Sequence, residues 1–61
     1  MPELTEKELA LIKDQLASEG MLVKKYRIGA ANCGDSAMSQ LLNQAADIHL
    51  KHFNTLISYV R

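Results

Sequence analysis

Three side chains that could bind a metal ion occupy positions where a packed helix would place apolar residues. Glu19 lies in the first half of the chain, and His49 and His52 lie three residues apart in "AADIHLKHF" in the second half. A spacing of three puts both rings on one side of a helix, and imidazole suits zinc, copper, iron or nickel. These residues allow a transition-metal site. They also allow a metal-free polar layer, in which Glu19 accepts a hydrogen bond from a histidine and fixes the register of the helices.

The first element needed to position these groups is a long helix that carries Glu19. Thr5 and Glu8 have the spacing of a capping box, in which each side chain accepts a hydrogen bond from the backbone N–H of the other residue. Apolar residues then recur at steps of three and four, without an interrupting proline. The pattern predicts a helix over about residues 6–31.

The second element is a helix that carries both histidines, and a short break separates it from the first. The break is "NCGDS", in which Gly34 can take the left-handed conformation that ends a helix and Asp35 can cap the next one. We therefore expect a turn at residues 32–35 and a second helix over about residues 36–59. Because so short a connection makes two helices antiparallel neighbours, the fold class is all-α, an antiparallel two-helix hairpin forming one domain.

The hairpin should bring the three polar side chains to one level. With its turn near Cys33 and Gly34, Glu19 and His49 lie equally far from the turn along their helices. His52 follows His49 by less than one helical turn. In a symmetric dimer, this layer would hold two glutamates and four histidines.

The apolar face of the two helices is wider than their mutual contact can cover. A chain this short buries only about 60% of the surface that it exposes when unfolded, and its one cysteine rules out an internal disulfide. A second copy is the natural cover, and two hairpins would then form a four-helix bundle. The residues predicted to line the dimer core are Leu9, Ile12, Leu16, Val23, Tyr26, Met38, Leu42, Ala45, Leu56 and Tyr59.

Charge and composition argue against several function classes. Seven basic and seven acidic residues give a net charge of zero, so the clustered basic excess of a nucleic-acid-binding protein is missing. Lys24, Lys25 and Arg27 read as a solvated helix face, and Asp47 as an outward-facing solubility residue. We find no apolar run long enough for a membrane span, no signal peptide and no catalytic motif. We expect an intracellular protein that is not an enzyme. Cys33 reads as an inert surface thiol or as an intermolecular crosslink.

Two long segments carry a family resemblance. "LTEKELALIKDQLASEGMLVKKY", a short turn with Asp35, and "MSQLLNQAADIHLKHFNTLISYV" together resemble the spore coat protein F family of spore-forming bacteria. The resemblance covers nearly the whole chain and implies a ferritin-like helical bundle. It further implies a small protein of the spore coat or of sporulation, with other coat proteins as partners.

Ferritin-like di-iron proteins use a glutamate on one helix and Glu-x-x-His on its neighbour. By this resemblance Glu19 matches the first element and His52 the histidine, whereas His49 stands where the second glutamate would be. A histidine-rich set implies zinc or another single transition metal, such as iron, rather than a di-iron pair.

Two functions follow from these observations, and a third is weaker. The first is a structural or assembly protein that acts through homodimerisation and protein–protein contacts and needs no cofactor. The alternative is a metal-binding ferritin-like bundle with its Glu/His site at the dimer core. The third is a small regulator of sporulation signalling proteins, although the acidic signature of such regulators is missing from the second helix.

Overall fold

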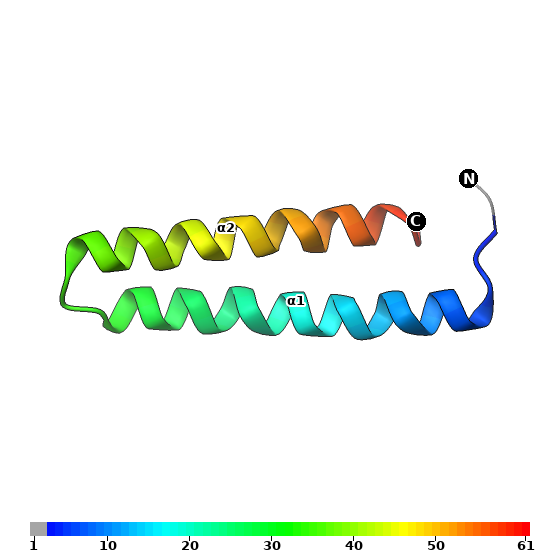
Figure 1. Ribbon diagram of the computed structural model, residues 1–61, viewed down its shortest axis with the longest axis horizontal. Helices are drawn as coiled ribbons and strands as arrows, with labels where there is room; N and C mark the ends of the chain where they lie inside the picture. The colour runs from blue at the N-terminus through cyan, green and yellow to red at the C-terminus, as the bar shows by residue number, and fades with distance from the viewer. Residues whose placement is uncertain (1–2) are drawn as a thin grey trace.

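The chain forms a hairpin of two long helices in the computed structural model, which describes residues 3–61. Helix α1 spans Glu6–Asn32 and helix α2 spans Ser36–Ser58. The helices lie side by side and run in opposite directions, so the start of α1 and the end of α2 lie at the same end of the hairpin (Figure 1). The predicted all-helical hairpin is confirmed, and residues 3–61 contain no strand.

Helix α1 begins with the capping box that the sequence predicts. The Thr5 hydroxyl accepts a hydrogen bond from the Glu8 N–H at 3.1 Å, and the Glu8 carboxylate accepts one from the Thr5 N–H at 3.0 Å. These bonds, chiefly that from the Thr5 backbone, hold the pKa of the Glu8 carboxyl below its ordinary value because they stabilise its charged form. Two N–H groups that would otherwise lack partners are thereby satisfied.

Helix α1 ends differently from the expectation. The prediction that Gly34 ends the helix in a left-handed conformation is wrong, because no residue among 3–61 has a positive φ. Cys33 is the C-cap instead, in an extended conformation with φ −88° and ψ 124°. The Asn32 side-chain amide donates to the Ile28 carbonyl at 2.9 Å and so satisfies one carbonyl of the last turn. The helix therefore runs one residue beyond the expected Ala31.

Helix α2 begins at a side-chain cap. The Asp35 carboxylate accepts a hydrogen bond from the Met38 N–H at 3.0 Å, as expected for an acidic N-cap. The helix ends at Ser58, and Tyr59 is its C-cap, one residue before the expected end. The connection between the helices is thus residues 33–35.

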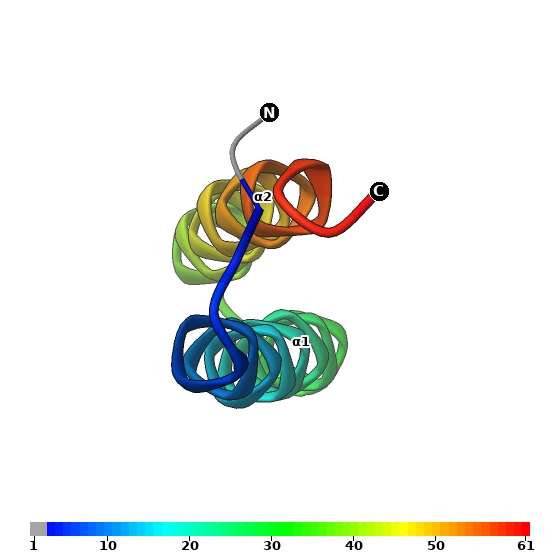
Figure 2. The same cartoon turned by 90° about the vertical axis from the view of Figure 1, so that its right-hand side faces the viewer.

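Small residues let the two helices approach closely. Ala30 and Ala46 are the two buried residues of the described chain, with 5% and 0% of their surface exposed. Gly20 lies against the Phe53 ring, and a Cβ added to it would be 3.7 Å from the nearest ring carbon. The Ser39 hydroxyl also donates to the Ala30 carbonyl at 2.9 Å. Figure 2, seen along the hairpin, shows the two helices inclined to one another.

The hairpin is elongated and has little interior. Its extents are 46 × 16 × 12 Å and its radius of gyration is 14.3 Å, against about 10.5 Å for a compact chain of this length. Of the residues predicted for the dimer core, Met38 and Tyr59 are each 50% exposed, and the other eight are half-buried. Neither helix combines the length and the apolar character that crossing a bilayer would require.

Candidate metal centre

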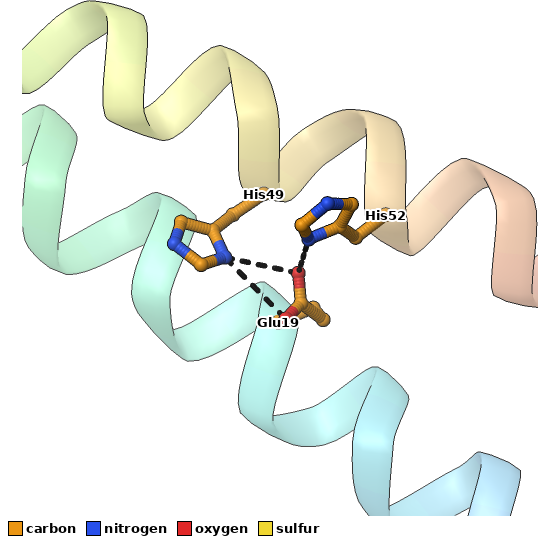
Figure 3. Close-up of side chains that lie close together, drawn as sticks. All are labelled: Glu19, His49 and His52. Carbon is orange, nitrogen blue, oxygen red and sulfur yellow. Dashed lines mark hydrogen bonds and ion pairs between the residues drawn. The ribbon is translucent and has the colours of Figure 1, made fainter.

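Glu19 and the two histidines meet between the helices. The Glu19 carboxylate points from α1 toward α2, and both rings point back at it (Figure 3). The His49 Nδ1 atom lies 3.1 Å from Glu19 Oε2 and 3.4 Å from Oε1. The His52 Nδ1 atom lies 3.2 Å from the same Oε2. One ligand atom from each residue lies within 4.8 Å of the others, so the structure brings together all three residues chosen from the sequence.

The three side chains differ in burial. The Glu19 side chain is 14% exposed, the His49 side chain 23% and the His52 side chain 57%. The carboxylate and one imidazole therefore lie inside the contact between α1 and α2, whereas the second imidazole borders solvent. This gradient gives the cluster a fixed inner part and an accessible outer part.

Aromatic packing fixes the orientation of the inner imidazole. The Tyr26 ring stacks on the His49 ring, with centroids 5.6 Å apart and planes inclined by 10°. The His52 ring meets His49 edge-on, with centroids 5.5 Å apart and an interplanar angle of 89°. Stacking on one face and an edge contact restrict rotation of the His49 ring, so its Nδ1 atom stays directed at the carboxylate.

The arrangement supports two chemical states. In the metal-free state, the tautomer with a proton on Nδ1 lets each imidazole donate a hydrogen bond to Glu19 Oε2. In a metal-bound state, both Nδ1 atoms are unprotonated and, with the carboxylate, present two nitrogens and one oxygen to a cation. The same atoms serve both states, so no other side chain has to enter the cluster.

A second polar contact between the helices was not expected from the sequence. Arg27 donates to the Asp47 carboxylate at 2.7 Å and to the Asn43 side-chain oxygen at 3.0 Å. Both residues are exposed, as expected from the sequence, but the sequence did not predict that they pair with one another and so join α1 to α2. Distance from the turn did not indicate this pairing, because Arg27 lies seven residues before Gly34 and Asp47 thirteen residues after it. The pairing also depends on the rotation of each helix about its axis.

The two polar contacts lie on different sides of the hairpin. Asp47 and His49 are two residues apart, so their side chains leave α2 about 200° from one another. We call the side with Glu19, His49 and His52 the histidine side, and the side with Arg27 and Asp47 the arginine side.

No protein-family model, curated protein or solved structure matches this chain. The resemblance to the spore coat protein F family therefore stays a prediction.

Proposed function

We propose that this protein is a small structural or assembly protein that works as a homodimer. The observation that carries the proposal is a row of side chains along the histidine side of α2, which we call the α2 stripe. Its large members Met38, Leu41, Ile48 and Tyr59 are 50%, 62%, 54% and 50% exposed. The complete α2 stripe is Met38, Leu41, Ala45, Ile48, His52, Thr55 and Tyr59.

The spacing of the α2 stripe is that of a helix-packing seam. Successive members are three or four residues apart, which is the repeat that keeps one face of a helix against a neighbouring helix. Helix α1 does not cover the large members of this stripe, as their exposure shows. The stripe is thus a second seam, adjacent to the one that packs on α1.

A second copy of the chain is the occupant that fits this seam best. The stripe contains no Asp, Glu, Lys or Arg, so two copies can face one another across a twofold axis without repulsion between permanent charges. The accessible surface of the hairpin is 4829 Å², roughly 800 Å² more than the about 4,000 Å² of a compact monomer of its mass. That excess is comparable to the about 800 Å² that each partner buries in a stable dimer interface.

The proposed dimer is a four-helix bundle that buries both α2 stripes in its centre. The outer surfaces then carry the charged residues and remain free for contacts with other proteins. The spore coat as the site of action, and other coat proteins as partners, are the part of the proposal that rests on the family resemblance.

Size-exclusion chromatography with light scattering tests the self-association. The chain mass is 6.8 kDa, and we expect about twice that mass at micromolar concentration. Leu41→Lys, which places a charge in the α2 stripe, should give a monomer. Leu50→Lys is the matched control, because Leu50 is exposed but lies outside the stripe. A stable wild-type monomer, or equal effects of the two variants, would contradict the proposal.

A further inference from the structure

We propose that Glu19, His49 and His52 form a binding site for one divalent transition-metal ion, and that zinc is its best-suited occupant. All three ligands come from one chain, so the site does not depend on self-association. The ligand atoms are Nδ1 of each histidine and Oε2 of the glutamate.

Both nitrogen–oxygen separations in the cluster match the geometry of a small tetrahedral ion. Zinc lies about 2.0–2.1 Å from nitrogen and carboxylate ligands, which places neighbouring ligand atoms of a tetrahedron about 3.3 Å apart. The two separations between Nδ1 and Oε2 are 3.1 and 3.2 Å. The two histidine ligand nitrogens lie within 4.8 Å of one another. A zinc ion would take the place of the two hydrogen-bonding protons, with the more exposed His52 side chain adjusting its position to the ion.

The charge of Glu19 gives an independent reason for a cation. This side chain is only 14% exposed, and within residues 3–61 its ion-pair partners are the two imidazoles alone. A carboxylate removed from water needs a compensating charge or strong hydrogen bonds. An imidazole supplies that charge only when it is protonated, whereas a divalent ion supplies the charge while both histidines are neutral.

The donor set selects the class of metal. Two imidazole nitrogens and one carboxylate oxygen suit zinc and its transition-metal neighbours. Calcium and magnesium take mainly oxygen ligands and usually six or more of them, so this set is a poor match for either. Three protein ligands also leave a fourth position of the tetrahedron open. In a single hairpin, the half-exposed His52 side chain marks the side from which the ion and a water ligand can reach the site, and the proposed dimer would cover this side once the ion is bound.

A bound ion would join the middle of α1 to the middle of α2. Because the site requires both helices at their folded spacing, an ion binds the folded hairpin in preference to the unfolded chain and raises its stability. The metal-bound cluster would thus cross-link the two helices of a hairpin that has little buried core of its own.

Zinc affinity and thermal unfolding test this site directly. The protein is purified without a histidine tag and freed of metal with a chelator. Zinc is then titrated against a chelating dye, and thermal unfolding is followed by circular dichroism with and without zinc. Glu19→Gln and His49→Gln remove one ligand each while keeping a polar side chain of similar size. Asp47→Asn is the matched control, because it alters the polar contact on the arginine side.

We expect zinc to raise the melting temperature of the wild type and of Asp47→Asn. Glu19→Gln and His49→Gln should weaken zinc binding by at least roughly 100-fold, because loss of even an outer-shell partner can cost 10- to 100-fold. Circular dichroism of the metal-free variants checks that each remains helical. The proposal is overturned if zinc leaves the wild-type melting temperature unchanged, or if the two ligand variants bind zinc as tightly as Asp47→Asn.

Discussion

The histidine side and the arginine side join the same two helices in different ways. On each side, one residue of α1 reaches two residues of α2. The Arg27 and Asp47 side chains are 42% and 64% exposed, whereas the Glu19 side chain is 14% exposed. An exposed ion pair contributes about 0–1 kcal/mol because water and salt compete with it. The two sides therefore differ in the burial of their polar contacts and not in the number of those contacts.

The surroundings of the two polar contacts also differ, because they are apolar on the histidine side and solvated on the arginine side. The histidine side carries the exposed apolar residues of the α2 stripe next to the cluster. The arginine side presents a solvated ion pair with an amide, which needs no cover. The histidine side is therefore the side on which both the proposed metal site and the proposed dimer contact lie.

The largest expected effect follows from removing the shared acceptor on the histidine side. Glu19→Ala leaves the half-buried His49 and its neighbour without their common hydrogen-bond acceptor. We expect the free energy of unfolding to fall by about 1–3 kcal/mol, the usual cost of leaving such groups unsatisfied. Chemical denaturation in the presence of a chelator measures this change without a contribution from metal. A loss no larger than that of an arginine-side variant would remove the distinction between the two sides.

A gain in stability is expected where a glycine in the contact between the two helices is replaced by alanine. Gly20→Ala should raise the free energy of unfolding by about 1 kcal/mol, because alanine is the better helix former. The new Cβ would lie 3.7 Å from the Phe53 ring, an ordinary contact distance. Gly29→Ala is a second instance, with Leu42 at 3.6 Å. Destabilisation by both changes would show that the helices need a closer approach than the structure has.

A smaller loss of stability than that of Glu19→Ala is expected for a variant on the arginine side. Asp47→Ala removes an exposed ion pair and should lower the free energy of unfolding by about 1 kcal/mol or less. The effect should shrink further at high salt, because the charges are accessible to screening ions. Denaturation at low and high ionic strength measures it. A large, salt-insensitive loss would mean that Arg27 and Asp47 matter as much as the buried cluster.

The smallest expected effect is the pH dependence of the stability that Glu8 contributes at the start of α1. Folding lowers the pKa of Glu8, so its contribution to stability is present above the pKa of the unfolded chain. That contribution is lost as the pH falls through the lower pKa of the folded state. Comparing the wild type with Glu8→Gln from pH 7 downward should show a difference in stability that shrinks in acid. A difference that is constant with pH would contradict the role of the Glu8 charge.

The local features of the fold could be predicted from the sequence because each depends on a few neighbouring residues. Thr5 and Glu8 define one helix start, and Asp35 defines the other. The level match of Glu19 with the histidines also needed only the position of the turn. Gly34 misled the prediction because a glycine permits a left-handed conformation without requiring one, and Cys33 ends α1 in an extended conformation instead.

The rotation of α2 about its own axis could not be predicted in the same way. Apolar residues occupy two adjacent stripes of this helix, so spacing alone does not say which stripe packs on α1. The structure buries Ala46 completely and leaves Leu41 and Ile48 exposed. The pairing of Arg27 with Asp47 depends on the same rotation, which only packing between the helices fixes.

Intermolecular contacts on the histidine side test the central claim most directly. An isotope-filtered NOE experiment on a mixture of labelled and unlabelled chains detects contacts between copies only. If the proposed dimer forms, NOEs should connect the methyl groups of Leu41 and Ile48 in one copy with the α2 stripe of the other copy. The proposed dimer would be contradicted by the absence of intermolecular NOEs at a concentration of about 1 mM, where even weak dimers with Kd near 10 µM are formed. It would also be contradicted by NOEs from Met21 and Ile28, two exposed apolar residues of α1, in place of the α2 stripe.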